Sequence, residues 1–440
     1  MSLTWPDQLE FELGELAPAL ADPVLNSMNF LNEIAGRYPG AISLAAGRPA
    51  EHTFDVGAIE RHVQRFCRYL REERGWDEAR VCRLLFQYGR TKGIITELIA
   101  RNLELDEQLS VDHEAIVVTV GCQEAMYLVL RALRADPSDV LFTVAPTYVG
   151  LTGAARLAEL PVWPVEGGAD GIDLADLTSK LGQARSAGLR PRALYVMPDF
   201  ANPSGLSMSL AHRRRLLEVA AGENLLLLED NPYGLFPQEL SDRQPTLKAL
   251  DQRRQVVYLG SFAKSALPGA RVGYLVADQV VRDRNGNAGL FADELAKVKS
   301  MLTVNTSPIS QAVVAGKLLE HDGSLIPATA ADRGVYRDNL RRVLAGLQRR
   351  FPDGAHGVRA NAPAGGFFVV VTVPFPVDDA LLERSAADYG VLWTPMHHFY
   401  DAGQAVNSLR LSCSVVTAEQ IELGLDRLAA LIHDRLEEAG

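Results

Sequence analysis

Short apolar runs alternate with amphipathic segments through the middle of the chain. The run AIVVTVG at 115–121 is rich in β-branched residues and ends in glycine, and the segment CQEAMYLVLRALR after it has apolar residues at helical spacing. This pattern predicts a strand, a tight turn and a helix. A second helix is expected at 209–221. Further strands are predicted at 139–148, 192–205, 223–234, 255–265 and 271–277.

The predicted elements divide the chain into two domains. From about 51 to 325, strands that are apolar on both faces alternate with helices, which indicates an α/β domain with a mainly parallel sheet flanked by helices. Residues 326–440 predict a smaller α+β domain, with strands at 364–374, 389–395 and 407–414. Residues 1–50 are expected to form an N-terminal arm and to complete the small domain.

Composition and charge exclude several classes of function. The chain has 440 residues, which suits two domains, and a formal net charge of -11. Because nucleic-acid binding depends on clustered Lys and Arg, no nucleic-acid partner is expected. The four cysteines lack CxxC spacing, which favours a reducing compartment. The N-terminus lacks signal-peptide order and no apolar run is long enough to cross a membrane. We therefore expect a cytoplasmic enzyme.

Polar residues gather where the predicted strands end, which is the edge at which open α/β sheets bind ligands. Gly121 leads into a helix N-terminus, whose free N–H groups suit a phosphate, although a glycine also simply permits a tight turn. Asp230 ends a strongly apolar strand, where a carboxylate needs a cation or donor. It could hold a protonated ring nitrogen, or cap the adjoining turn.

Lys264 is the most informative of these residues. It lies among small and apolar residues in SFAKSALPGARVG, and the sequence offers it no evident salt-bridge partner. A desolvated lysine has a lowered pKa and can form a Schiff base with an aldehyde. Arg271, seven positions later, could bind a phosphate with its fork of donors. The alternative is a surface lysine at a loop tip.

Seven motifs in one order resemble the class I/II aminotransferases of pyridoxal phosphate fold type I, in the branch of the aminoadipate and kynurenine aminotransferases. The resemblance covers the chain from about residue 40 onward. The motifs are QYG at 87–89, GCQEA at 121–125, APTY at 145–148, NPSG at 202–205, EDNPYG at 229–234, GSFAKSALPGARVGYL at 260–275 and NSLRLSCS at 407–414.

This resemblance implies pyridoxal 5'-phosphate as cofactor and assigns roles around its ring. Lys264 is similar to the lysine that forms the Schiff base and moves the substrate proton. Asp230 resembles the partner of the ring nitrogen. Asn202 and Tyr233 look like donors to the phenolic oxygen, and Tyr148 resembles the residue that stacks on the ring.

The resemblance also implies how phosphate and substrate are bound. Tyr88 is similar to a tyrosine that reaches the phosphate of a neighbouring subunit, so a homodimer with shared active sites is expected. Arg410 resembles the arginine that binds the substrate carboxylate, and Asn202, Gly47 and Arg48 are expected nearby. Arg48 could instead form a surface salt bridge. The phosphate group is expected to contact Gly121, Cys122, Gln123, Ser261 and Arg271.

Some positions depart from the family pattern. Cys122 replaces a Ser or Gly, Phe200 stands where Gln or His is common, and Asn231 follows Asp230 where a second Asp is typical. GRPAEHTFD at 47–55 is unusual beside the substrate. His397 and His398 are adjacent, so in a strand they would point to opposite faces and ligate one metal poorly. No metal is expected.

The expected function is transfer of an amino group between an L-amino acid and a 2-oxo acid, with a faint resemblance to specialised-metabolism enzymes that make phenylglycine-type amino acids. The departures keep open an alternative on the same scaffold, which is β/γ-elimination, replacement or carbon–carbon bond formation. A regulator with this fold is disfavoured because the cofactor-site residues remain and no basic DNA-binding segment precedes them.

Overall fold

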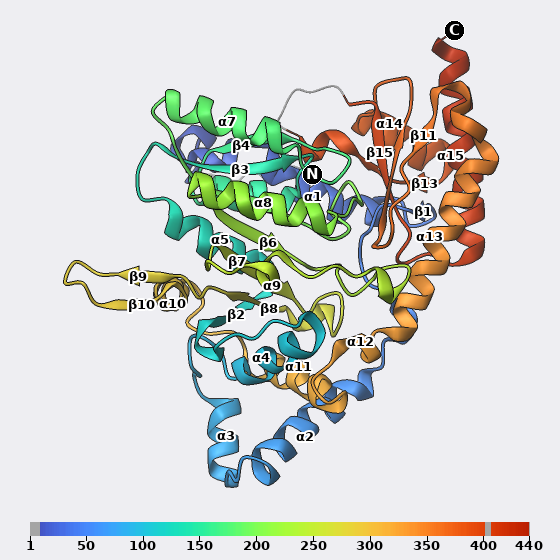
Figure 1. Ribbon diagram of the computed structural model, residues 1–440. Coiled ribbons are helices and arrows are strands. Elements are labelled where there is room, and N and C mark those ends of the chain that lie inside the picture. The colour runs from blue at the N-terminus through green and yellow to red at the C-terminus, as the bar shows by residue number, and fades with distance from the viewer. Residues whose placement is uncertain (1–8, 401–405, 440) are drawn as a thin grey trace.

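The computed structural model describes residues 9–400 and 406–439, and a seven-stranded sheet lies at the centre of the larger part (Figure 1). Its strand order is β2-β8-β7-β6-β5-β3-β4. The bounds are β2 Ile116–Val120, β3 Asp139–Ala145, β4 Val162–Glu166, β5 Arg190–Val196, β6 Leu226–Asp230, β7 Val256–Ser261 and β8 Val272–Val276. Six of these strands correspond to predicted segments, and β4 was missed because its run VWPVE contains a proline and is short.

The sheet is mainly parallel, as the sequence predicted. Strands β4, β3, β5, β6 and β7 are parallel neighbours, whereas β8 runs antiparallel to both β7 and β2. The reversed direction of β8 determines where Arg271 lies. The start of β8, directly after Arg271, lies at the same sheet edge as the carboxyl ends of β2 and β7.

Helices cover both faces of this sheet, because successive strand residues point to opposite sides. Leu228 and Val257 face one layer, and Leu227 and Val256 face the other. The first layer holds α5 Gly121–Leu133, α6 Val149–Leu157 and α10 Phe291–Leu302. The second layer holds α7 Leu174–Ser186, α8 Leu210–Glu223 and α9 Leu247–Leu250. Over β2 and β8 this layer continues with five more helices, which are α2 Val56–Glu72, α3 Glu78–Phe86, α4 Thr96–Glu107, α11 Pro308–Glu320 and α12 Leu325–Ala328.

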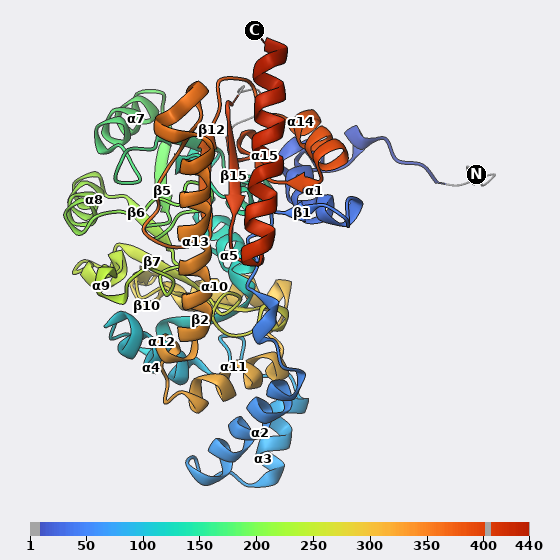
Figure 2. The same ribbon diagram turned by 90° about the vertical axis from the view of Figure 1, so that its right-hand side faces the viewer.

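The smaller part is built on a four-stranded antiparallel sheet with the order β11-β12-β15-β14. The long helices α13 Ala330–Arg350 and α15 Ala418–Ala439 lie side by side against it (Figure 2). The remaining bounds are β11 Arg359–Ala360, β12 Phe368–Thr372, α14 Asp379–Arg384, β13 Val391–Leu392, β14 Thr394–Pro395 and β15 Ser408–Ser412.

The N-terminal region joins this smaller part. Strand β1 Ile42–Ser43 pairs in parallel with β13, and Ile34 of helix α1 Pro23–Arg37 is buried in the same core. The limits 1–50, 51–325 and 326–440 stay a prediction. Strands β9 Val280–Arg282 and β10 Ala288–Leu290 form a hairpin that projects from the larger part (Figure 1). No helix within the described ranges is long and apolar enough to cross a membrane.

Candidate active site

One edge of the central sheet brings together the polar residues that the sequence placed at strand ends. Asp230 and Ser261 are the last residues of β6 and β7, and Gly121 begins α5 directly after β2. Arg271 precedes β8, whose antiparallel direction returns it to this edge. These residues lie together because each of the short, buried strands ends in a loop at this edge of the sheet.

Asp230 is a buried carboxylate held by two neutral donors. The hydroxyl of Tyr195 donates to Oδ2 at 2.6 Å, and Sγ of Cys122 lies 3.5 Å from Oδ1. Asp230 is 2% exposed, and among the described residues it forms no salt bridge. Burial raises the pKa of this carboxyl group to about 6. The carboxylate is therefore suited to a cationic group that the chain does not supply.

Lys264 is an amine without a negatively charged partner. Its Nζ donates to the carbonyl oxygen of Gly47 at 2.6 Å, and no described carboxylate pairs with it. Burial, and next the charge of Arg271, lowers the pKa of this amine to about 8. Nζ lies 5.8 Å and 6.0 Å from the ring centroids of Tyr233 and Phe367. A lysine in these surroundings is neutral often enough near pH 8 to act as a nucleophile or base.

Arg271 lies against the N-terminus of α5. Gly121 has a φ of +69°, and a Cβ there would come within 2.5 Å of Nη2 of Arg271. The glycine thus provides both the turn and the room for the guanidinium group. A helix N-terminus beside an arginine is well suited to a phosphate. The side chain of Gln123 is already used, since it donates to the carbonyl of Gly150.

Arg410 is buried on β15 and only partly satisfied. Nη1 donates to Oδ1 of Asn202, and Nη2 donates to the Ala45 carbonyl and Thr394 Oγ1 at 3.1 Å and 3.2 Å. Its Nε has no hydrogen-bond partner among the described residues. Burial lowers the pKa of the guanidinium to about 10. Buried donors in proteins normally have a hydrogen-bond partner, so we expect the Nε–H group of Arg410 to bind an acceptor from outside the chain.

Aromatic rings enclose the same arginine. The guanidinium carbon of Arg410 lies 4.2 Å from the ring centroid of Phe368 and 4.9 Å from that of Phe399. Lys264, Arg271 and Arg410 lie close enough together for the charges of the two arginines to lower the pKa of the lysine, after burial as the main cause. The site carries an excess of positive charge in an apolar setting and is suited to a ligand with more than one anionic group.

Four other residues that the sequence predicted for the site differ in their exposure and contacts. Tyr148 is half-buried, and burial followed by the charge of Asp230 raises the pKa of its hydroxyl to about 12. The hydroxyl of Tyr233 lies beside Asn202. Arg48 is exposed, and the alternative of a surface salt bridge is not found among the ion pairs of the described residues. Tyr88 is 86% exposed, outside the buried site of its own chain.

The expected orientation of His397 and His398 is wrong. Residues Met396–Phe399 form a 3-10 turn instead of a strand, so both rings reach Asp379. Nε2 of His398 and of His397 lie 2.8 Å and 3.5 Å from Oδ1 of Asp379, and His398 Nδ1 lies 3.0 Å from Ser27 Oγ. The three groups are close enough together to be considered as metal ligands. Because both rings already bind the carboxylate, the absence of a metal stays the prediction.

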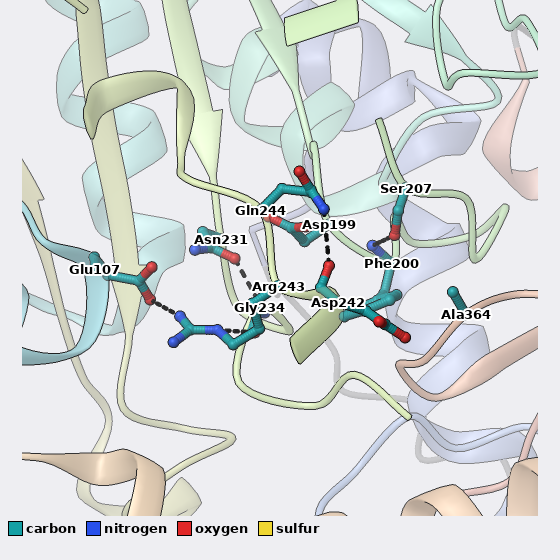
Figure 3. Close-up of a pocket in the computed structure, with 10 residues that line it drawn as sticks. All are labelled: Glu107, Asp199, Phe200, Ser207, Asn231, Gly234, Asp242, Arg243, Gln244 and Ala364. Carbon is teal, nitrogen blue, oxygen red and sulfur yellow. Dashed lines mark hydrogen bonds and ion pairs between the residues drawn. The ribbon is translucent and has the colours of Figure 1, made fainter. Parts of the chain in front are cut away.

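Phe200, one of the departures from the family pattern, lines a separate cavity of about 40 Å³ (Figure 3). Arg243 crosses this cavity between Glu107 and the carbonyl of Gly234. A space of this size holds water and excludes a cofactor. The cavity is therefore structural, and Phe200 packs against Gly365 and Gly366 beside it.

Sequence reasoning missed four residues that contact the predicted site. Tyr195 holds Asp230, Thr394 holds Arg410, and Phe368 and Phe399 flank that arginine. Only Tyr195 had a local signal, as a tyrosine within an apolar strand. The others depend on the pairing of β14 with β15 and on the position of the small domain.

Comparison with known proteins gives a consistent result. The family model "Aminotransferase class I and II" matches residues 52–428. The chain is 56% identical to the (S)-3,5-dihydroxyphenylglycine transaminase of Amycolatopsis orientalis over 427 residues, which cover 97% of this chain and 96% of that protein. Among solved structures, LysN, the alpha-aminoadipate aminotransferase of Thermus thermophilus, has a TM-score of 0.78 and 29% identity over 97% of this chain and 99% of its own. The kynurenine aminotransferase of Pyrococcus horikoshii has a TM-score of 0.79 and 26% identity, covering 96% and 97%.

Proposed function

This chain belongs to the class I and II aminotransferase family and is a pyridoxal-phosphate-dependent transaminase, and we propose that its amino acid substrate is an arylglycine of the dihydroxyphenylglycine kind. Its architecture is that of fold type I, which confirms the fold class and cofactor predicted from the sequence. The observation that carries the substrate proposal is the aromatic enclosure of Arg410 and Lys264, together with the 56% identity.

The residues at the sheet edge fit the cofactor. Asp230, buried without a cation, suits the ring nitrogen, and Arg271 with Ser261 and the start of α5 suits the phosphate. The Asn202 amide and the Tyr233 hydroxyl are assigned to the phenolic oxygen, and Tyr148 to the ring face. When bound, pyridoxal phosphate supplies an electron sink that stabilises negative charge on the substrate Cα.

The remaining steps belong to the chain's own side chains. Arg410 binds the substrate carboxylate, for which the open Nε and the planar fork are suited. Lys264 Nζ, as its neutral amine, would take the proton from the substrate Cα and hold it for its return. Its lowered pKa makes it a base near neutral pH. Arg410 is buried and Lys264 is half-buried, which limits the access of water during the proton transfer.

An arylglycine carries its ring directly on Cα, so the ring must lie within one bond of the reacting carbon. A substrate with its carboxylate on Arg410 and Cα near Lys264 meets the rings of Tyr233, Phe367 and Phe368 at that point. The same substrate has no leaving group on a Cβ position, which leaves transamination as the productive outcome.

A homodimer with shared active sites is the second part of the proposal. Tyr88, Phe86 and Met301 are 86%, 85% and 84% exposed. Gly89 lies against Asn305, so the loop of Tyr88 adjoins the end of α10. Large apolar side chains exposed together on one surface favour association. In this assembly the partner's Tyr88 contacts the phosphate.

The test is a single-turnover experiment with the cofactor-loaded enzyme. We expect 3,5-dihydroxyphenylglycine and 4-hydroxyphenylglycine to convert the cofactor to its amino form, with formation of the matching arylglyoxylate. Phenylalanine and tyrosine, which add one methylene between ring and Cα, should react at least about tenfold less efficiently. Reaction with tyrosine but with neither arylglycine would refute the arylglycine assignment and leave the transaminase assignment intact.

A further inference from the structure

Asp230 is held by side chains that the established chemistry of the family does not require. Residue Tyr195 on β5 pairs with Leu228 on β6, and alternation places Asp230 on the same face, two residues further on. The Tyr195 hydroxyl therefore reaches Oδ2 of Asp230 from the neighbouring strand. Residue Cys122 approaches the other oxygen from the first turn of α5, which covers this face.

The Tyr195 hydroxyl and the Cys122 thiol can act only as hydrogen-bond donors to the Asp230 carboxylate. Burial, and next the nearby charge of Asp230, raises the pKa of the Tyr195 hydroxyl well above its ordinary value, and the same two causes do so for the Cys122 thiol. Both groups thus keep their protons. Each donated hydrogen bond favours the ionised form of Asp230 and opposes the effect of burial.

The protonation state of Asp230 matters because, with the cofactor bound, Asp230 and the ring nitrogen would share one proton. A pyridine nitrogen is a weak base, and a buried carboxylate becomes a stronger base as it loses donors. If the carboxylate takes the proton, the ring becomes neutral and a poorer electron sink. If the nitrogen keeps it, the ring cation pairs with Asp230.

We propose that Tyr195 and Cys122 are positioning residues that hold Asp230 as an oriented carboxylate, so that the shared proton stays on the ring nitrogen of the cofactor. Tyr195 has the larger effect, because its hydroxyl lies at 2.6 Å and a thiol at 3.5 Å is a weak donor. The inference rests on the proposed contact between Asp230 and the ring nitrogen and is independent of which amino acid the enzyme uses.

Cys122 is one of the departures from the family pattern, and it occupies a position from which a side chain can donate to Asp230. Its thiol faces Asp230, and its place at the helix N-terminus leaves the backbone N–H groups to the phosphate. Cys122→Ser should retain a donor, whereas Cys122→Ala should remove it.

The experiment is nitrogen NMR of the holoenzyme loaded with pyridoxal phosphate labelled with ¹⁵N in the ring. We expect the wild-type resonance at the position of a protonated ring nitrogen. In Tyr195→Phe it should move toward the neutral position, and in Cys122→Ala by a smaller amount in the same direction. The matched control is Tyr258→Phe, which removes an equally buried hydroxyl on β7 that contacts Asn231 and makes no bond to Asp230.

A second readout separates positioning from general loss of structure. Tyr195→Phe should raise the Kd for pyridoxal phosphate about tenfold. It should raise the Kd for the 1-deaza analogue, which has carbon in place of the ring nitrogen, less than about twofold. Equal losses for the two ligands would mean a merely structural tyrosine and would overturn the proposal.

The outcomes are distinguishable. A ring nitrogen that stays protonated in Tyr195→Phe and Cys122→Ala overturns this inference and leaves the cofactor site unchanged. A neutral nitrogen in the wild-type enzyme overturns the Asp230 assignment itself, and the inference with it. If Tyr195→Phe does not fold, Cys122→Ala decides by the same resonance, with Cys122→Ser as the variant that should restore the wild-type position.

Discussion

The amine of Lys264 donates a hydrogen bond to the carbonyl oxygen of Gly47, although 217 positions separate them in sequence. The same N-terminal segment is held by Arg410, which binds the Ala45 carbonyl, and by Ser412, whose Oγ binds the Ala46 carbonyl at 2.9 Å. Lys264 and Arg410, which we propose to bind cofactor and substrate, therefore also hold residues 45–47 beside them.

This contact makes Gly47 a sensitive position. A Cβ at Gly47 would lie 2.5 Å from Cζ of Phe368, so Gly47→Ala must displace the segment or the ring. We expect kcat/KM to fall about tenfold and the unfolding free energy to fall by about 1–3 kcal/mol. The control is Gly40→Ala, in the same segment, whose Cβ would meet nothing within 4 Å. Equal activity of the two variants would show that the segment adjusts freely.

Loading of the cofactor should depend on the lowered pKa of Lys264. Only the neutral amine attacks an aldehyde, and the pKa of about 8 predicts a loading rate that rises about tenfold per pH unit below pH 8 and flattens above it. Stopped-flow absorbance of apoenzyme mixed with pyridoxal phosphate measures this profile. An ordinary lysine would instead show a rise that continues to about pH 10.

Two variants control that measurement. Lys264→Ala should give no visible absorbance from lysine-bound cofactor. Lys297→Ala, which removes an exposed amine paired with Glu294, should leave the profile as in the wild type. Lysine-bound absorbance that persists in Lys264→Ala would overturn the assignment of the reactive lysine.

Arg410→Lys should damage substrate binding although it preserves the charge. A lysine cannot replace the planar fork or the open Nε donor, so we expect kcat/KM for the amino acid to fall about 10- to 100-fold. The Kd for pyridoxal phosphate should change little. Arg349→Lys, at an exposed pair with Glu422, is the matched control. A fall of similar size in cofactor affinity would argue for a general structural role.

Shared active sites can be tested with mixed dimers. Lys264→Ala and Tyr88→Ala should each be defective alone, whereas a mixed dimer has one site with both intact residues. Co-expression should restore about a quarter of wild-type activity, because half of the dimers are mixed and each has one complete site. Lys264→Ala mixed with the Lys264→Ala/Tyr88→Ala double variant should restore none. Failure to recover activity in the first mixture would place Tyr88 outside the partner's site.

The contact of His397 with Asp379 should make stability depend on pH. The hydrogen bond to Asp379 raises the pKa of His397, and burial opposes this. The stability from the protonated histidine is present below about pH 6.5 and is lost as pH rises through its raised pKa. Hydrogen bonds from His397 and His398 lower the pKa of Asp379 despite its burial, so the carboxylate's contribution is lost only in strong acid.

We therefore expect the difference in Tm between wild type and His397→Gln to be larger at pH 6 than at pH 9. The effect should stay below about 1 kcal/mol, because Asp379 is half-exposed. Asp378 and His398 are the other titratable groups facing this pair and are unchanged in both proteins. His52→Gln, at an exposed position, is the control variant. An equal difference at both pH values would rule out a charged His397.

The sequence alone determined six of the seven strands of the central sheet and the residues at their ends. Short apolar runs fix the strands, and the edge of a parallel sheet collects the residues that come directly after them, so Asp230, Lys264 and Arg271 could be placed in one site. The spacing of Lys264 and Arg271 acquires its meaning from β8, whose antiparallel direction brings Arg271 back to the edge. That reversal could not be read from an apolar run, which looks the same in either direction.

Only the tertiary structure decided which groups touch. Alternation on neighbouring strands brings Tyr195 to Asp230, and the packing of the two domains brings Gly47 to Lys264. The pairing of β14 with β15 brings Thr394 to Arg410, and a 3-10 turn directs two adjacent histidines to one carboxylate. Such contacts depend on distances between segments that are remote along the chain, and local patterns of apolar and polar residues carry no information on those distances.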